Sequence, residues 1–313
     1  MRRTLLTVLI LPSLGLAAPR YEADNLRPEI GVAEIGRGNR GLLLARGPAA
    51  AWWNPALLQQ EEQSRLALQH SELFGGLLSQ DFIGCSGSWH GLRGAAFISR
   101  SSVSDIPLSS ALDGAATLEE GGRPIVSDRV DTADWILALA LARPVSDRLD
   151  AGATLKLIWR DLATHSAQGL GLDLGLRYRL LPRLELGASL KDVPATMILW
   201  DDGQSDTIWP ELALGAALLQ PLPFAGAILR TELGAHTDLD GATSDSRGHF
   251  RTIWLDAGGE IEFPGRLALR AGYAESRFSV GAGLGLGRFA VDYAFRPHED
   301  LDTSHLVAAS CRF

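Results

Sequence analysis

A glycine-rich motif near the N-terminus is of the kind that can hold a phosphate group. Gly36, Gly38 and Gly41 form the pattern G-x-G-x-x-G in the stretch GRGNRG. Such a motif binds a dinucleotide when it joins a strand to a helix within a βαβ unit, because the helix N-terminus and the bare glycine backbone then meet the pyrophosphate. No βαβ pattern follows the motif here. We therefore interpret these glycines as part of a flexible segment.

Side chains that catalyse reactions or bind transition metals occur without the spacing that such sites need. Neither H-E-x-x-H nor G-x-S-x-G is present, and the histidines are scattered along the chain. A serine and a histidine distant in sequence could still meet in space, as in barrel phospholipases, but no nucleophile motif indicates it. We therefore predict no enzyme activity, no catalytic residue, no cofactor and no metal site. The histidines are His70, His90, His165, His236, His249, His298 and His305.

Aspartates cluster in two segments and offer oxygen ligands of the type that calcium prefers. Their spacing matches no dedicated calcium loop, and a solvated acidic rim is the simpler interpretation. The first set is Asp201, Asp202 and Asp206, and the second is Asp238, Asp240 and Asp245.

The N-terminus and the net charge restrict the location and the partners. Arg2 and Arg3 precede an apolar stretch, Leu5 to Leu16, and a small-residue cleavage site, which together predict a cleaved signal peptide over residues 1–17. The apolar stretch is shorter than the roughly 20 residues of a spanning helix, which disfavours a membrane anchor. The formal charge of −8 predicts that nucleic acid is not a partner.

From residue 64 onward, apolar and polar residues alternate, which is typical of strands with two different faces. The clearest stretch is 168–180, in which leucines and one tyrosine alternate with glycine, aspartate and arginine. Along the chain this pattern predicts about fourteen strands, many near the roughly 9–11 residues of a tilted membrane-crossing strand. Short turns alternate with mostly longer loops, and the largest loops are expected at 103–131 and 192–208.

Two architectures can use such strands. In a soluble sandwich the apolar faces meet in a core, whereas in a membrane barrel they meet lipid and the polar faces line the interior. The polar faces here combine glycine and serine with charges of both signs, and the last strand ends in Phe313, as in the assembly signal of bacterial outer-membrane barrels. We therefore predict an all-β fold, a single transmembrane antiparallel β-barrel of about 14 strands over residues 64–313, surrounded by outer-membrane lipid.

The barrel leads to expectations for charged and aromatic side chains. Lumen charges are expected to pair across the interior, a structural role that we prefer over substrate binding. Aromatic residues near strand ends are expected at the lipid interfaces, except Trp254, which alternation places on the lumen face. The lumen charges are Lys156, Asp173, Arg177, Arg179, Glu185, Arg230, Glu232, Asp256 and Glu260.

Both ends of the chain resemble one family. GRGNRGLLLARGPAAAWWNPALL is similar to the N-terminal signature of PorV/PorQ-like proteins, within the larger group of FadL-type outer-membrane barrels. The stretch from RLALRAGY to the closing CRF resembles the last strands of that family, and WPELALGAAL resembles an inner strand. The sequence departs from the family in the short loop 274–277 and in Cys311. The resemblance implies an N-terminal plug, or hatch, in the barrel lumen, here residues 18–63.

The functions within this family diverge, and the sequence leaves two of them open. The first is a non-enzymatic accessory in protein secretion or surface display, of the PorV/PorQ type, with secretion-system components or cargo as partners. The alternative is a FadL-like channel for the uptake of hydrophobic small molecules such as long-chain fatty acids. A purely structural barrel is a third reading.

Two short segments are candidate functional sites. The first joins the plug to the barrel, and because its proline fixes φ and lacks a backbone donor, we predict the hinge there if the plug moves. The second is an apolar run in the loop 192–208, a candidate hydrophobic entrance; it could instead extend a strand or pack on the barrel top. The hinge residues are Trp52, Trp53, Asn54 and Pro55, and the entrance residues are Met197, Ile198, Leu199 and Trp200.

Overall fold

A computed structural model of the chain shows how the predicted strands pair. It describes residues 27–89, 91–111, 124–223, 226–239, 253–298 and 301–313. Within these residues, fourteen antiparallel strands close into a barrel, because β1 pairs with β16 and β5 pairs with β6. A further hairpin, β8–β9, is attached to β6.

The first half of the barrel wall is made of β1 (Arg65–Leu73), β2 (Leu78–Trp89), β3 (Leu92–Ala111), β4 (Pro124–Pro144), β5 (Leu149–Leu162), β6 (His165–Leu181) and β7 (Leu184–Lys191). The second half is made of β10 (Glu211–Leu222), β11 (Ala227–Asp238), β12 (Trp254–Glu262), β13 (Leu267–Ala274), β14 (Arg277–Leu286), β15 (Phe289–Arg296) and β16 (Ser304–Arg312). The attached hairpin is β8 (Thr196–Trp200) and β9 (Ser205–Ile208).

The two faces of the wall are opposite to those of a soluble protein. On β6, Leu174 and Leu176 point outward and are 41% and 46% exposed, whereas Asp173 and Arg177 point inward and are 1% and 8% exposed. Soluble domains bury the leucines and expose the charges. An apolar belt around a polar interior is the arrangement that lipid requires, and closure leaves no unpaired strand edge within the belt.

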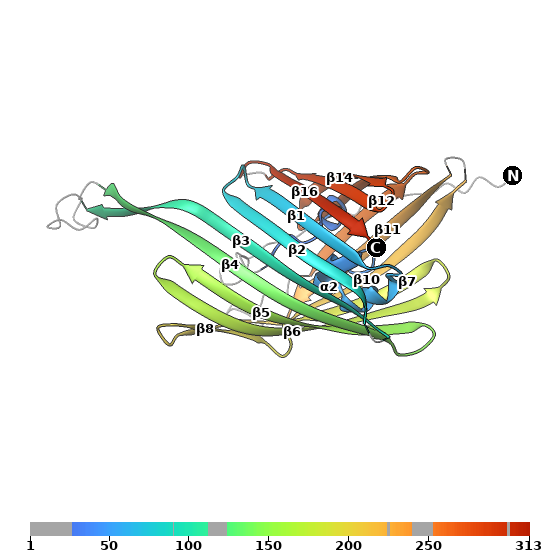
Figure 1. Cartoon of the computed structure of the whole chain (residues 1–313), viewed down its shortest axis with the longest axis horizontal. Helices are drawn as coiled ribbons and strands as arrows, with labels where there is room; N and C mark the ends of the chain where they lie inside the picture. The colour runs from blue at the N-terminus through green and yellow to red at the C-terminus, as the bar shows by residue number, and fades with distance from the viewer. Residues whose placement is uncertain (1–26, 90, 112–123, 224–225, 240–252, 299–300) are drawn as a thin grey trace.

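The prediction of an all-β barrel with about fourteen strands is confirmed. The expectation of large loops at 103–131 and 192–208 was wrong in part. β3 and β4 both extend into the segment 103–131, and beyond Ser102 and Thr132 they pair only with each other (Figure 1). The segment 192–208 holds the β8–β9 hairpin. No helix among the described residues has the length and apolar character to cross a membrane.

Residues 27–63 lie inside the barrel and form four short helical segments (Figure 1). α1 packs against β14 and β15, and η3 packs against β4 and β5. Most residues of this segment are buried, so we call it the plug. The predicted signal peptide, residues 1–17, lies outside the described residues. The helical segments are α1 (Val32–Gly36), η2 (Gly47–Ala49), α2 (Ala50–Trp53) and η3 (Pro55–Gln60).

Glycines in the wall make room for the plug. A Cβ built on Gly272 would lie 2.1 Å from the carbonyl carbon of Arg37, and one on Gly258 would lie 1.9 Å from the Arg37 oxygen. Gly38 itself has a φ of +92°, which L side chains rarely adopt. The plug backbone therefore crosses the inner wall at a contact that only glycines permit.

Candidate functional site

The helix α2 places two indole rings in the middle of the barrel. Ala50 and Ala51 are fully buried, and the hydroxyl of Thr154 on β5 donates to the Ala51 carbonyl at 2.7 Å. The small alanines thus let the helix lie directly on the wall. Trp52 meets Phe97 edge-to-face at 6.5 Å between ring centroids, and the Trp53 indole N–H donates to the Ile30 carbonyl at 2.8 Å.

Asn54 fastens the end of α2 to both the plug and the wall. Its amide nitrogen donates to the Leu42 carbonyl at 2.9 Å and to the Leu176 carbonyl on β6 at 3.0 Å. Its amide oxygen accepts from the Ala56 N–H at 3.1 Å and thereby caps η3. The hinge that we predict at Trp52, Trp53, Asn54 and Pro55 is thus a fully buried segment, and any movement there must break these hydrogen bonds.

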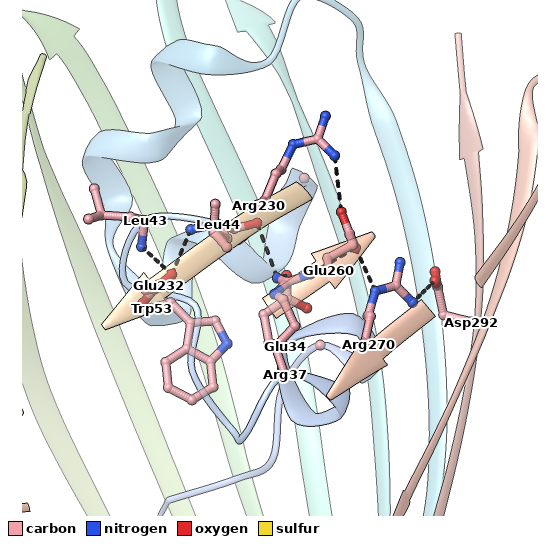
Figure 2. A network of polar contacts seen from close by, with 12 residues as sticks. Glu34, Arg37, Leu43, Leu44, Trp53, Arg230, Glu232, Glu260, Arg270 and Asp292 are labelled. Carbon is pink, nitrogen blue, oxygen red and sulfur yellow. Dashed lines mark hydrogen bonds and ion pairs between the residues drawn. The ribbon is translucent and has the colours of Figure 1, made fainter. Parts of the chain in front are cut away.

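Glu232 on β11 holds the middle of the plug. Its carboxylate accepts from three consecutive backbone N–H groups, those of Leu42, Leu43 and Leu44, at 2.9, 3.1 and 3.0 Å (Figure 2). These donors have no helical partner, so the carboxylate satisfies groups that would otherwise be buried and unpaired. The expectation that Glu232 pairs with another lumen charge was wrong in this respect: its hydrogen bonds go to the plug backbone.

Ion pairs hold α1 beside Glu232. The Arg37 guanidinium binds Glu34 at 3.0 Å and Glu260 of β12 at 3.2 Å. Glu260 also binds Arg270 of β13 at 2.6 Å, and Arg270 binds Asp292 of β15 at 2.7 Å (Figure 2). This chain of alternating charges links the plug to three strands of the wall.

The G-x-G-x-x-G segment serves this packing. It begins at the end of α1, and Gly36 lies against Gly281, where an added Cβ would be 3.0 Å from the Gly281 Cα. A Cβ added to Gly41 would likewise lie only 2.8 Å from the Trp53 side chain. No strand precedes the motif and no βαβ unit surrounds it among the described residues, so the geometry of a dinucleotide site is missing there.

Above the plug lies an outer cavity of about 540 Å³, between the tryptophans and the ends of the strands that carry the longer loops. Its lining includes both indole rings of α2 and apolar side chains from five strands of the wall and the β8–β9 hairpin. Trp254 stacks on His236 at 5.1 Å on the lumen side, as alternation predicted. The main apolar lining residues are Trp52, Trp53, Ile136, Ile158, Ile208 and Trp254.

Two lysines lie over the aromatic floor of the outer cavity. The Lys191 ammonium is 4.5 Å from the Trp52 ring centroid and 4.9 Å from that of Trp53. The Lys156 ammonium is 5.4 Å from the Trp52 centroid and forms ion pairs with Asp173 at 2.7 Å and Asp192 at 2.6 Å. Cations over indole faces add about 0.5–2 kcal/mol each, which helps to fix the rings in place.

The apolar run that we consider as an entrance lies in the strand β8. Its conformation is therefore that of the alternative interpretation, in which the run extends a strand. β8 continues along β6 beyond the end of β7. Met197 and Leu199 point outward and are 56% and 57% exposed, while Ile198 is buried. Trp200 is half-buried, and its indole N–H donates to Asp206 at 2.8 Å. The run thus presents an apolar surface outside and a buried contact inside.

The candidate calcium ligands are only partly described. Asp240 and Asp245 lie outside the described residues. Asp201 accepts from the Ser166 N–H at 2.9 Å, and Asp202 accepts from the Gln204 N–H at 2.9 Å. These carboxylates thus stabilise the turns around β8 and β9. In the part of the chain that the structure describes, no three histidine, cysteine or carboxylate side chains converge as metal ligands would.

The expectation that lumen charges pair holds for most of them. Lys156 pairs with Asp173, and Arg177 on β6 pairs with Asp150 on β5 at 2.9 Å and with Glu185 on β7. No motif or spacing in the sequence indicates that Arg37, Asn54 and Glu232 hold the plug. Only the Asn-Pro pair drew attention to one of them, because it ends a helix.

A second, inner cavity of about 200 Å³ lies on the other side of the plug. It extends to the short-turn end of the barrel, where Arg266 and Arg312 line it. No residue lines both cavities. In the described part of the chain the plug therefore separates an outer cavity with an aromatic floor from an inner cavity lined by arginines and carboxylates.

Comparisons with known proteins find likeness in structure but not in sequence. No protein-family model and no curated protein matches the chain. The toluene transporter TodX of Pseudomonas putida matches with a TM-score of 0.61 at 14% identity, over 90% of this chain and 98% of that chain. A FadL homologue of Pseudomonas aeruginosa matches with 0.58 at 13% identity, over 91% and 98%. The monoaromatic hydrocarbon channel CymD matches with 0.57 at 13% identity, over 90% and 97%.

At these identities the likeness shows the fold. The chain has the fourteen-stranded barrel of FadL-type outer-membrane proteins. The FadL-type part of the resemblance seen in the sequence is therefore confirmed for the fold. Nothing specific to PorV/PorQ-like proteins appears among these structures. TodX is named a toluene transporter and CymD a monoaromatic hydrocarbon channel.

Proposed function

We propose that this protein is a non-enzymatic channel of the bacterial outer membrane that takes up hydrophobic small molecules. The observation that carries the proposal is the outer cavity of about 540 Å³, whose floor is formed by Trp52 and Trp53. Its lining combines aromatic and branched aliphatic side chains with many charged ones, and a cavity of this size that holds both kinds of group can accommodate a small molecule. The named substrates of the similar structures, toluene and monoaromatic hydrocarbons, are of the same chemical class.

The plug sets the route that such a molecule would follow. It separates the two cavities, so passage through the lumen requires part of the plug to move. We propose the segment Trp52 to Pro55 as the hinge of this movement, since it contains the cavity floor and leads from there through η3 to the first strand. We propose the outward face of β8, with Met197 and Leu199, as the entrance from the lipid side.

Secretion or surface display was the first function that the sequence suggested. The similar structures give it no support, and their printed functions favour the channel. The two readings differ in partners. A channel needs lipid and a small molecule, whereas an accessory must associate with secretion components or cargo, which a pull-down from outer membranes would recover.

The channel function is tested by uptake of radiolabelled toluene and of a labelled long-chain fatty acid into cells that carry the chain as their only such barrel. Replacing Ile136 and Ile158 by threonine puts hydroxyl groups into the cavity at little change in volume. Each buried hydroxyl without a partner disfavours an apolar ligand by about 1–3 kcal/mol, so uptake should fall at least about tenfold.

The matched control is Val291→Thr, a similar change on the outward face of β15, where the side chain is 46% exposed. This variant should take up the label at the wild-type rate. Uptake equal in all variants, or equal to that of cells without the barrel, would rule out the cavity as the path.

A further inference from the structure

The inner cavity contains two tiers of arginines that differ in their partners. Six arginines and four carboxylates line it. In the tier next to α1, Arg37 and Arg270 are held by Glu34, Glu260 and Asp292, as described above. Glu262 is likewise bound by Arg230. The carboxylates of the cavity are therefore already neutralised by cations of the plug and the wall.

The tier at the short-turn end has no such carboxylates. Arg266, in the turn after β12, and Arg312, at the end of β16, both donate to the same acceptor, the carbonyl oxygen of Gly287. Each guanidinium has several further donors. Among the described residues, neither forms an ion pair with a carboxylate. Two like charges thus meet at one neutral acceptor, an arrangement that an anion would stabilise.

Two more arginines face this tier from the plug side. Arg46 is exposed to the cavity and forms no ion pair within the described residues. Arg65, at the start of β1, contacts Glu61 at 3.4 Å, and its Nε is buried without a hydrogen-bond partner.

We propose that the inner cavity is an oxyanion site, in which Arg46, Arg65, Arg266 and Arg312 bind a phosphate or carboxylate group. Guanidinium groups present forked donors that match both groups. A volume of about 200 Å³ suits a headgroup and excludes a large apolar molecule. Short turns of outer-membrane barrels face the periplasm, so the site would receive its oxyanion from that side or from the end of a molecule leaving the plug.

The site is tested by isothermal titration calorimetry on the refolded full-length mature chain in a non-ionic detergent. The probes are inorganic phosphate, hexyl phosphate and hexanol. Phosphate and hexyl phosphate binding equally well would identify a free oxyanion as the ligand, and hexyl phosphate binding at least about tenfold more tightly would identify the headgroup of an amphiphile. Hexanol should not bind at this site. Binding should weaken as sodium chloride is added, because salt screens the charges.

The variant Arg266→Gln/Arg312→Gln should lose at least about tenfold in affinity, since it removes two charged hydrogen-bond donors from the site. Arg46→Gln should weaken binding as well, and it changes no barrel strand. Arg183→Gln is the matched control, an exposed arginine in the turn after β6 that does not line the cavity. Heat-modifiable gel migration confirms that each variant is folded.

No binding of either phosphate probe to the folded wild-type protein would overturn the proposal. Binding that all arginine variants retain would overturn it equally. Neither result bears on the uptake of hydrophobic molecules through the outer cavity, which is measured separately, so the two proposals can fail independently.

Discussion

At the scale of single residues, the inner wall is specified as much by absent side chains as by present ones. Gly258 and Gly272 leave room for the Arg37 carbonyl, and Gly175 leaves room for Asn54, whose Oδ1 would be 2.1 Å from an added Cβ. Each of these glycines lies on a strand, where glycine otherwise weakens pairing and packing. The stability that these glycines remove from the strands is offset by the plug, which packs directly against the strand backbone.

We predict that Gly272→Ala displaces the plug. The new methyl group would overlap the Arg37 backbone, and overpacking of this kind typically costs about 1–3 kcal/mol. The thermal midpoint of the refolded barrel should fall, and ion conductance in planar bilayers should rise as the plug leaves the wall. Gly234→Ala is the control, because its Cβ would meet only the Leu214 oxygen, at 3.5 Å. Equal conductance and stability in both variants would contradict the close fit.

Little of this residue-level detail could be predicted from the sequence. Asn54-Pro55 marks a helix end because proline cannot continue the helix, and the structure ends α2 at Trp53. One partner of Asn54 lies on another part of the plug, 12 residues away in sequence, and the other lies on β6, 122 residues away. Local spacing does not encode such pairings, and the same is true of Arg37 with Glu260.

At the scale of elements, alternation predicts strands well and their ends poorly. A strand facing lipid on one side and a polar lumen on the other must alternate, so the period is a direct physical consequence of the barrel. Beyond the membrane this constraint ends. The outer parts of β3 and β4 and the β8–β9 hairpin depend on pairing between two segments, and each segment alone reads as a loop.

The attachment of the plug by β11 gives a prediction at this scale. Glu232→Ala removes the acceptor that the described residues provide for the N–H groups of Leu42, Leu43 and Leu44. Each buried donor left unsatisfied costs about 1–3 kcal/mol, so amide hydrogen exchange at these three residues should accelerate at least about tenfold. Mass spectrometry of the refolded protein measures the rates.

Glu185→Ala provides the comparison, since Glu185 binds only Arg177 of the wall. Exchange at residues 42–44 should stay at the wild-type rate in this variant. If Glu232→Ala leaves the exchange unchanged, the plug is held mainly by α1 and Asn54.

At the scale of the whole molecule, the first and last strands form the seam of the barrel. β1 pairs with β16, and Ser64 and Phe313 exchange backbone hydrogen bonds at 3.2 and 3.0 Å. The Phe313 side chain is 69% exposed on the outside. An outward aromatic at a strand end suits the membrane interface; the assembly role of this residue stays a prediction.

We predict that Phe313→Ala reduces assembly more than stability. The fraction of protein that shows folded, heat-modifiable migration in outer membranes should fall several-fold, while the thermal midpoint of the assembled barrel should shift by only a few degrees for about 1 kcal/mol of lost contact. Phe289→Ala is the control, an outward aromatic on β15 that is 62% exposed. Equal assembly of both variants would show that the terminal position has no special role.

The position of the plug in the chain affects how the barrel and the plug come together. The plug directly precedes β1 in the chain, whereas β16, which completes the ring, follows the other strands. The plug touches β4 and β5 on one side and β14 and β15 on the other, so its binding surface comes from both early and late parts of the chain. Ring closure and the seating of the plug therefore depend on the same last strands, so a chain that lost β14 to β16 would lack both the closing strand and part of the surface that holds the plug.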